Sequence, residues 1–106
     1  MKSLSAQAKD IERQIKRIVR DADIEKLSLQ ERKLVEKLKM ACNEVWLDVR
    51  DYEYAETREE QIKWRKLGRH NIAAAEQYLL ELGTIFGPVD SAELSANLSA
   101  ISEQLN

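Results

Sequence analysis

The chain has 106 residues, of which 34% are charged and 43% hydrophobic, and its formal net charge is −2 at pH 7. This length suits one domain with a thin core, and 27 Leu, Ile, Val and Phe residues are too many for a disordered chain. One cysteine excludes an internal disulfide. Because no apolar run resembles a membrane span or a signal peptide, we expect a cytoplasmic protein.

The first expected helix covers residues 3–21. Its apolar residues alternate three and four apart at Leu4, Ala8, Ile11, Ile15, Ile18 and Ala22. This heptad-like spacing predicts an amphipathic bundle helix, with a coiled coil as the alternative. Short acids favour turns, so residues 21–27 form a predicted connector, and residues 1–27 are the first structural unit.

The second unit is residues 28–83. It opens with a capping box, Ser28 and Glu31, and continues as an apolar stripe at Leu34, Val35, Leu38, Ala41, Cys42, Val45, Val49 and Tyr52. A second capping box at Thr57 and Glu60 predicts a break near residue 57, which would make this unit a long antiparallel hairpin. The alternative is a helix that continues to Gly68. Gly83 is expected to end the unit.

Residues 84–89 are the predicted linker, and residues 90–106 the last helix. Asp90 is the expected N-cap, with Glu93 completing its capping box. The last helix has a narrow apolar seam at Leu94, Leu98, Ile101 and Leu105. Together the patterns predict an all-α helical bundle of about four helices, one domain over residues 1–106. We expect it to be dimeric, because thin amphipathic helices with opposed charge patches bury more surface by pairing.

Catalytic signals are few. The single histidine, His70, follows Arg65 by five residues. This spacing resembles the Arg-x(4 to 6)-His motif of HEPN-type ribonucleases, all-helical domains that act as dimers. The resemblance covers six residues and departs from the family at Lys66, where a polar residue usually follows the arginine. It implies a ribonuclease in which Arg65 and His70 act.

The acids of residues 44–60 fit a solvated helix face better than a site for a pair of metal ions. They are Glu44, Asp48, Asp51, Glu56, Glu59 and Glu60. Bundle di-iron sites need Glu-x-x-His pairs, and the sequence contains none. We therefore expect no metal, no cofactor and no catalytic residues.

Two basic clusters favour nucleic-acid binding as an alternative function. The first is Arg13, Lys16, Arg17 and Arg20, and the second is Lys63, Arg65, Lys66 and Arg69, with Trp64 in its midst as a stacking ring. Against this alternative, the overall charge is negative. Helical pairs such as Glu12 with Lys16 and Glu59 with Lys63 would also neutralise these cations.

Aromatic residues at the edge of a helical face are typical of protein interfaces. We expect Trp46, Tyr54 and Trp64 to contact a partner protein. Leu94, Leu98 and Ile101 join them if the last helix is exchanged between chains. The function we expect is that of a small, non-catalytic interaction or regulatory protein, such as an adaptor, a chaperone-like factor or an assembly factor, which recognises its partner by helix-helix contact.

Overall fold

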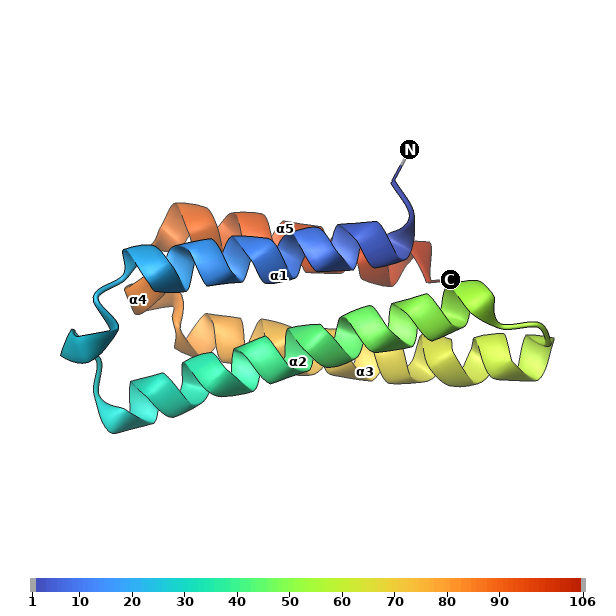
Figure 1. Cartoon of the computed structure of the whole chain (residues 1–106), viewed down its shortest axis with the longest axis horizontal. Coiled ribbons are helices and arrows are strands. Elements are labelled where there is room, and N and C mark those ends of the chain that lie inside the picture. The colour runs from blue at the N-terminus through green and yellow to red at the C-terminus, as the bar shows by residue number, and fades with distance from the viewer. Residues whose placement is uncertain (1, 106) are drawn as a thin grey trace.

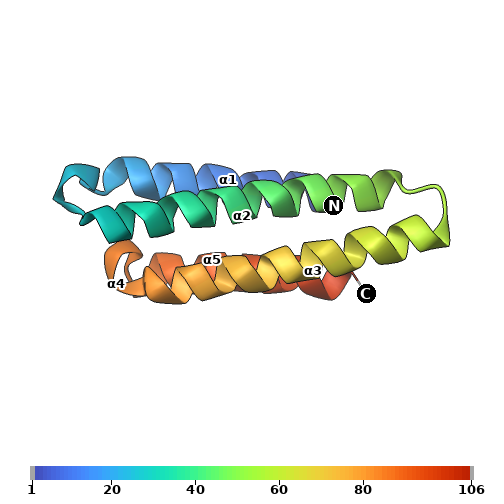
Figure 2. The same cartoon turned by 90° about the horizontal axis from the view of Figure 1, so that it is seen from below.

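The computed structural model describes residues 2–105. Its helices are α1 (Leu4–Asp21), a 3₁₀ turn (Ile24–Lys26), α2 (Leu29–Tyr54), α3 (Arg58–Glu81), α4 (Gly83–Phe86) and α5 (Pro88–Gln104). The prediction of an all-helical fold is confirmed for the described residues. Figures 1 and 2 show the four long helices side by side, each running opposite to the long helix before it.

Local hydrogen bonds explain where α2 and α3 begin. The Ser28 hydroxyl accepts a hydrogen bond from the Glu31 N–H at 3.1 Å, and the Glu31 carboxylate accepts one from the Ser28 N–H at 2.9 Å. At α3 the Thr57 hydroxyl accepts from the Glu60 N–H at 3.1 Å, but the Glu60 carboxylate reaches back to the Glu56 N–H at 3.3 Å. The chain therefore turns over residues 55–57.

Gly68 does not interrupt α3, so a helix break at this glycine is wrong. The glycine is buried where α3 approaches α2 and the last residues of the chain. A Cβ atom at Gly68 would lie 3.2 Å from Leu105 Cδ1 and 3.7 Å from Asp48 Cβ. Close packing between elements, rather than a turn, is what this position requires.

The connection to α5 also differs from the prediction. Gly83 begins the short helix α4, and α5 begins at Pro88, so Asp90 lies in the first turn and caps nothing. A proline suits the first helical position because its φ is preset and its missing N–H would have no partner there. The turn is made by Gly87, whose φ of 86° is in the left-handed region that favours glycine.

The four long helices share one core. Its buried members include Ile11 and Ile15 of α1, Leu38 and Val45 of α2, Ile72 and Leu79 of α3, and Leu94, Leu98 and Ile101 of α5. Helix α1 packs mainly against α2 and α5, and α3 packs mainly against the same two helices. Helices α1 and α3 therefore occupy opposite corners of the bundle, as do α2 and α5 (Figures 1 and 2). The turn between α2 and α3 projects beyond the nearby ends of α1 and α5.

Candidate functional site

The three predicted interface aromatics lie on separate parts of the two middle helices. Trp46 is half-buried beside α1, with Lys9 Nζ 4.4 Å and Arg50 Cζ 5.2 Å from its ring centroid. Tyr54, the last residue of α2, is 77% exposed. Trp64 is half-buried on α3, and the Lys63 ammonium lies 4.7 Å from its ring centroid. Two of the three rings thus already contact cations of this chain.

The predicted interface residues of the last helix belong to the core of this chain. Leu94 and Leu98 are each 1% exposed, and Ile101 is 0% exposed. A partner would contact these three side chains only if α5 left its place in the bundle. Apart from Val89, which is 77% exposed near the start of α5, the surface of α5 that remains open is formed mainly by small and polar residues.

The two basic clusters do not form one surface, because α1 and α3 lie at opposite corners of the bundle. On α1, Arg13 lies 3.4 Å from Asp10 and Arg20 lies 3.7 Å from Asp21. The expected helical pairs also differ. Glu12 pairs with Lys9 rather than with Lys16. Lys63 stacks on Trp64, and among the described residues it forms no ion pair with Glu59.

The second cluster is open to solvent. Lys63, Lys66 and Arg69 are exposed on α3, and Arg65 is half-buried. The side chains of Arg65 and His70 do not converge on one point of the helix. A separation of five residues places them roughly 140° apart around an α-helix with 3.6 residues per turn. The two residues therefore lie on different faces of α3.

The acids of α2 and α3 do not gather around a metal position. Among residues 2–105, no group of three or more His, Cys, Asp and Glu side chains is placed to hold a metal ion. Asp48 is the exception to the expected solvated face, because it is only 5% exposed. Its Oδ2 accepts a hydrogen bond of 2.6 Å from Asn71 Nδ2, which ties α2 to α3.

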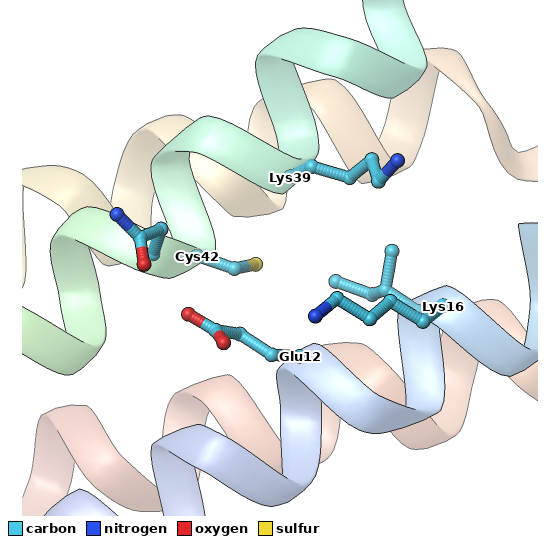
Figure 3. A pocket seen from close by; sticks show the side chains of 6 residues that line it. Glu12, Lys16, Lys39 and Cys42 are labelled. Atoms are coloured by element: carbon cyan, nitrogen blue, oxygen red, sulfur yellow. The ribbon is translucent and has the colours of Figure 1, made fainter.

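A cavity of about 120 Å³ lies between α1 and α2, and Glu12 and Cys42 both extend into the space between these helices (Figure 3). Glu12 is 8% exposed, and no described residue donates a hydrogen bond to its Oε1. Figure 3 shows the Lys16 ammonium turned toward this carboxylate and Lys39 directed away. Burial, and then the charge of Glu12, raise the pKa of the Cys42 thiol to about 12. The thiol is therefore protonated and weakly nucleophilic at neutral pH.

A mainly apolar groove of about 480 Å³ lies between the C-terminal half of α3 and residues 91–99 of α5. We call it the α3–α5 groove; it is lined by Glu76, Leu79, Leu80 and Gly83 on one side and by Ser91, Ala92, Ser95 and Ser99 on the other. The Ser99 hydroxyl donates a 2.8 Å hydrogen bond to Glu76 Oε1. Because the α5 side chains are small, they do not fill the space beside α3.

Leu80 is the most exposed large apolar side chain of the groove, at 77%. The sequence-based candidates did not include it. A signal was present, because Leu80 lies about 100° around the helix from Leu79 and is off the row of apolar residues spaced three and four apart. The apolar residues at this spacing in α3 and at its C-cap, Ile72, Ala75, Leu79 and Leu82, are all buried, whereas Leu80 remains exposed.

Comparison with known proteins finds no matching family model, no matching curated protein and no matching solved structure. Within the described part of the chain, no helix combines the length and the apolar character that crossing a bilayer requires. The function is therefore inferred from the surfaces described above.

Proposed function

We propose that this chain is a non-catalytic interaction protein that recognises a helix in its α3–α5 groove. The observation that carries the proposal is Leu80, a leucine 77% exposed at the edge of a groove of about 480 Å³ whose opposite wall has only small side chains. Small residues let a second helix approach to the short end of the usual 8–10 Å distance between helix axes.

The energetics favour a helix as the ligand of this groove. Covering Leu80 completely would stabilise a complex by about 1.5–3 kcal/mol. One charged group, Glu76, lines the groove, and its carboxylate already accepts a hydrogen bond from Ser99. An apolar side chain from a partner helix would thus enter the groove without leaving a new polar group unpaired.

Cross-linking at Leu80 tests this proposal. We would replace Leu80 with a photoreactive phenylalanine analogue and use the same replacement at Tyr54, which is 77% exposed at the end of α2, as the matched control. We expect a discrete protein adduct from position 80, mapped to an amphipathic helix of the partner, and none from position 54. Equal adducts at both positions, or none at 80, would contradict helix recognition in the groove.

A second candidate function is nucleic-acid binding through α3. It is favoured by the exposed cations Lys63, Lys66 and Arg69, which form no ion pair with other described residues. Phosphate contacts weaken steeply with salt, because they release counterions. If α3 binds RNA or DNA, a Lys63→Gln, Lys66→Gln double variant should bind less tightly and show a smaller salt slope. Helix docking in the groove should be unaffected by the same double variant.

A further inference from the structure

We infer that one occupant of the α3–α5 groove is the N-terminal half of α2 from a second copy of this chain. This inference rests on the proposed function of the groove and names its partner. The surface concerned, which we call the α2 strip, is formed by Leu29, Lys33, Lys37 and Met40. Spacings of four, four and three residues place these side chains on one face of α2.

The α2 strip is open and partly apolar. Six large hydrophobic side chains are exposed among the described residues; Leu29 and Met40 belong to the strip, at 69% and 67% exposure. Two others lie at the groove. Leu80 lines it, and Val89 is three residues before Ala92 and so shares its face of α5. Four of the six exposed large hydrophobic side chains therefore lie on these two surfaces, where docking of one copy on the other would cover them.

The charges of the two surfaces are opposite. Residues 29–40 carry four Lys and Arg against two Glu. Lys33 and Lys37 are exposed, and neither is in an ion pair with another described residue. In contrast, residues 70–106 contain five acids and no Lys or Arg. Glu76 lies in the groove, while Glu81 and Glu93 are exposed on the helices that flank it.

A contact of groove against groove is disfavoured by the same charges. A two-fold axis through that interface would bring Glu76, Glu81 and Glu93 near their own copies, with no cation from residues 70–106 between them. Pairing the α2 strip with the groove instead places Lys33 and Lys37 against acids. Since the net charge of the chain is only −2, little long-range repulsion opposes the approach of two copies.

The contact is heterologous, because it joins two different surfaces. Each copy in a pair keeps one strip or one groove unused, so wild-type assemblies can grow beyond two copies or close into a ring. Association also costs translational and rotational freedom, and the apolar area is small. We therefore expect a weak contact, with a dissociation constant on the order of micromolar or higher.

Complementation between two blocked variants tests this arrangement. Leu80→Glu blocks the groove, and a Lys37→Glu, Met40→Glu double variant blocks the strip. All three side chains are exposed, so circular dichroism should show both variants folded. By sedimentation equilibrium, wild type should associate as its concentration rises, and each variant alone should associate at least about tenfold more weakly. An equimolar mixture should form a 1:1 complex, because one good groove then meets one good strip.

Tyr54→Glu is the matched control, since Tyr54 is as exposed as Leu80 but lies at the far end of α2. Its association should equal that of wild type. A wild type that stays monomeric up to about 1 mM, or a mixture that stays monomeric while wild type associates, would overturn the strip-to-groove contact. Neither result would contradict helix recognition in the α3–α5 groove, which the cross-link at position 80 tests separately. Absence of that cross-link would reject both helix recognition in the groove and the strip-to-groove contact.

Discussion

Asp48 is the residue whose charge the fold opposes most clearly. It is buried between α2 and α3, and burial raises the pKa of its carboxyl above the usual 3.8, with smaller contributions from the charges of Glu44 and Asp51. The hydrogen bond from Asn71 acts in the other direction, because it favours the ionised form. A folded-state pKa above the unfolded one means that this carboxyl stabilises the fold most below pH 3.8. That stability is lost as the pH rises through the folded-state pKa.

Asp48→Asn should therefore raise the free energy of unfolding at pH 7. The asparagine keeps an oxygen that can accept the Asn71 hydrogen bond but carries no charge to desolvate. The gain should shrink toward zero as the pH falls below 3.8, where the wild-type carboxyl is also neutral. Urea unfolding at pH 7 and pH 3.5 measures both values. Glu93→Gln, at an exposed position, should change stability by less than about 0.5 kcal/mol, and a destabilised Asp48→Asn would show that the ionised carboxylate is required.

Gly68 tests how tightly α3 approaches its neighbours. A valine there would push its methyl groups toward Leu105 and Asp48, whose nearest atoms lie 3.2 Å and 3.7 Å from the added Cβ alone. We expect Gly68→Val to destabilise the fold by about 1–3 kcal/mol, the usual cost of overpacking. Thermal or urea unfolding measures this loss. Gly83→Val is the control, because nothing lies within 4 Å of a Cβ at Gly83; equal losses in the two variants would point to helix propensity instead of packing.

At the scale of an element, the start of α2 depends on one side chain. The Ser28 hydroxyl and the Glu31 carboxylate satisfy each other's backbone N–H groups. Ser28→Ala should lower the free energy of unfolding by about 1 kcal/mol, the typical value for an N-cap. Calorimetry measures the accompanying fall in Tm. Ser91→Ala should not lower stability, because the buried Ser91 hydroxyl has no hydrogen-bond partner among the described residues. Equal Tm values for Ser28→Ala and wild type would exclude a contribution from the cap.

At the scale of the whole molecule, the labelling rate of the Cys42 thiol measures how often the bundle opens. It is the single cysteine of the chain, and it lies 2% exposed on α2, facing α1. If the thiol must wait for an opening that costs about 5 kcal/mol, a disulfide reagent should label native protein at least about a thousandfold more slowly than unfolded protein. Labelling at pH 8, with and without urea, measures the ratio. Fast labelling of native protein would mean that α1 and α2 separate locally without unfolding of the whole bundle.

The whole molecule also separates its charges. All 17 Lys and Arg residues lie in residues 1–69, and the remaining 37 residues carry acids alone. Folding brings the acidic α5 beside α1 and α3, so its acids lie near cations of α1 on one side of the bundle. The α3–α5 groove, lined by Glu76, and the basic α2 strip lie on different sides of the bundle.

The sequence by itself determined the helical character and the positions where α2 and α3 begin. The caps at Ser28 and Thr57 depend on residues three apart, and each apolar stripe depends on residues three and four apart. Such interactions lie within one or two helical turns. A sequence pattern therefore contains all the information they need.

The tertiary structure alone decided which of the ambiguous residues face the core and which remain open. Gly68 could have ended a helix, but its neighbours Asp48 and Leu105 make it a packing position inside one. The α3–α5 groove exists because small residues of α5 lie opposite Leu80, and residues 80 and 92 meet only when the bundle forms. Burial depends on side chains from distant parts of the chain, and the spacing of residues within one helix does not predict which of them will be neighbours.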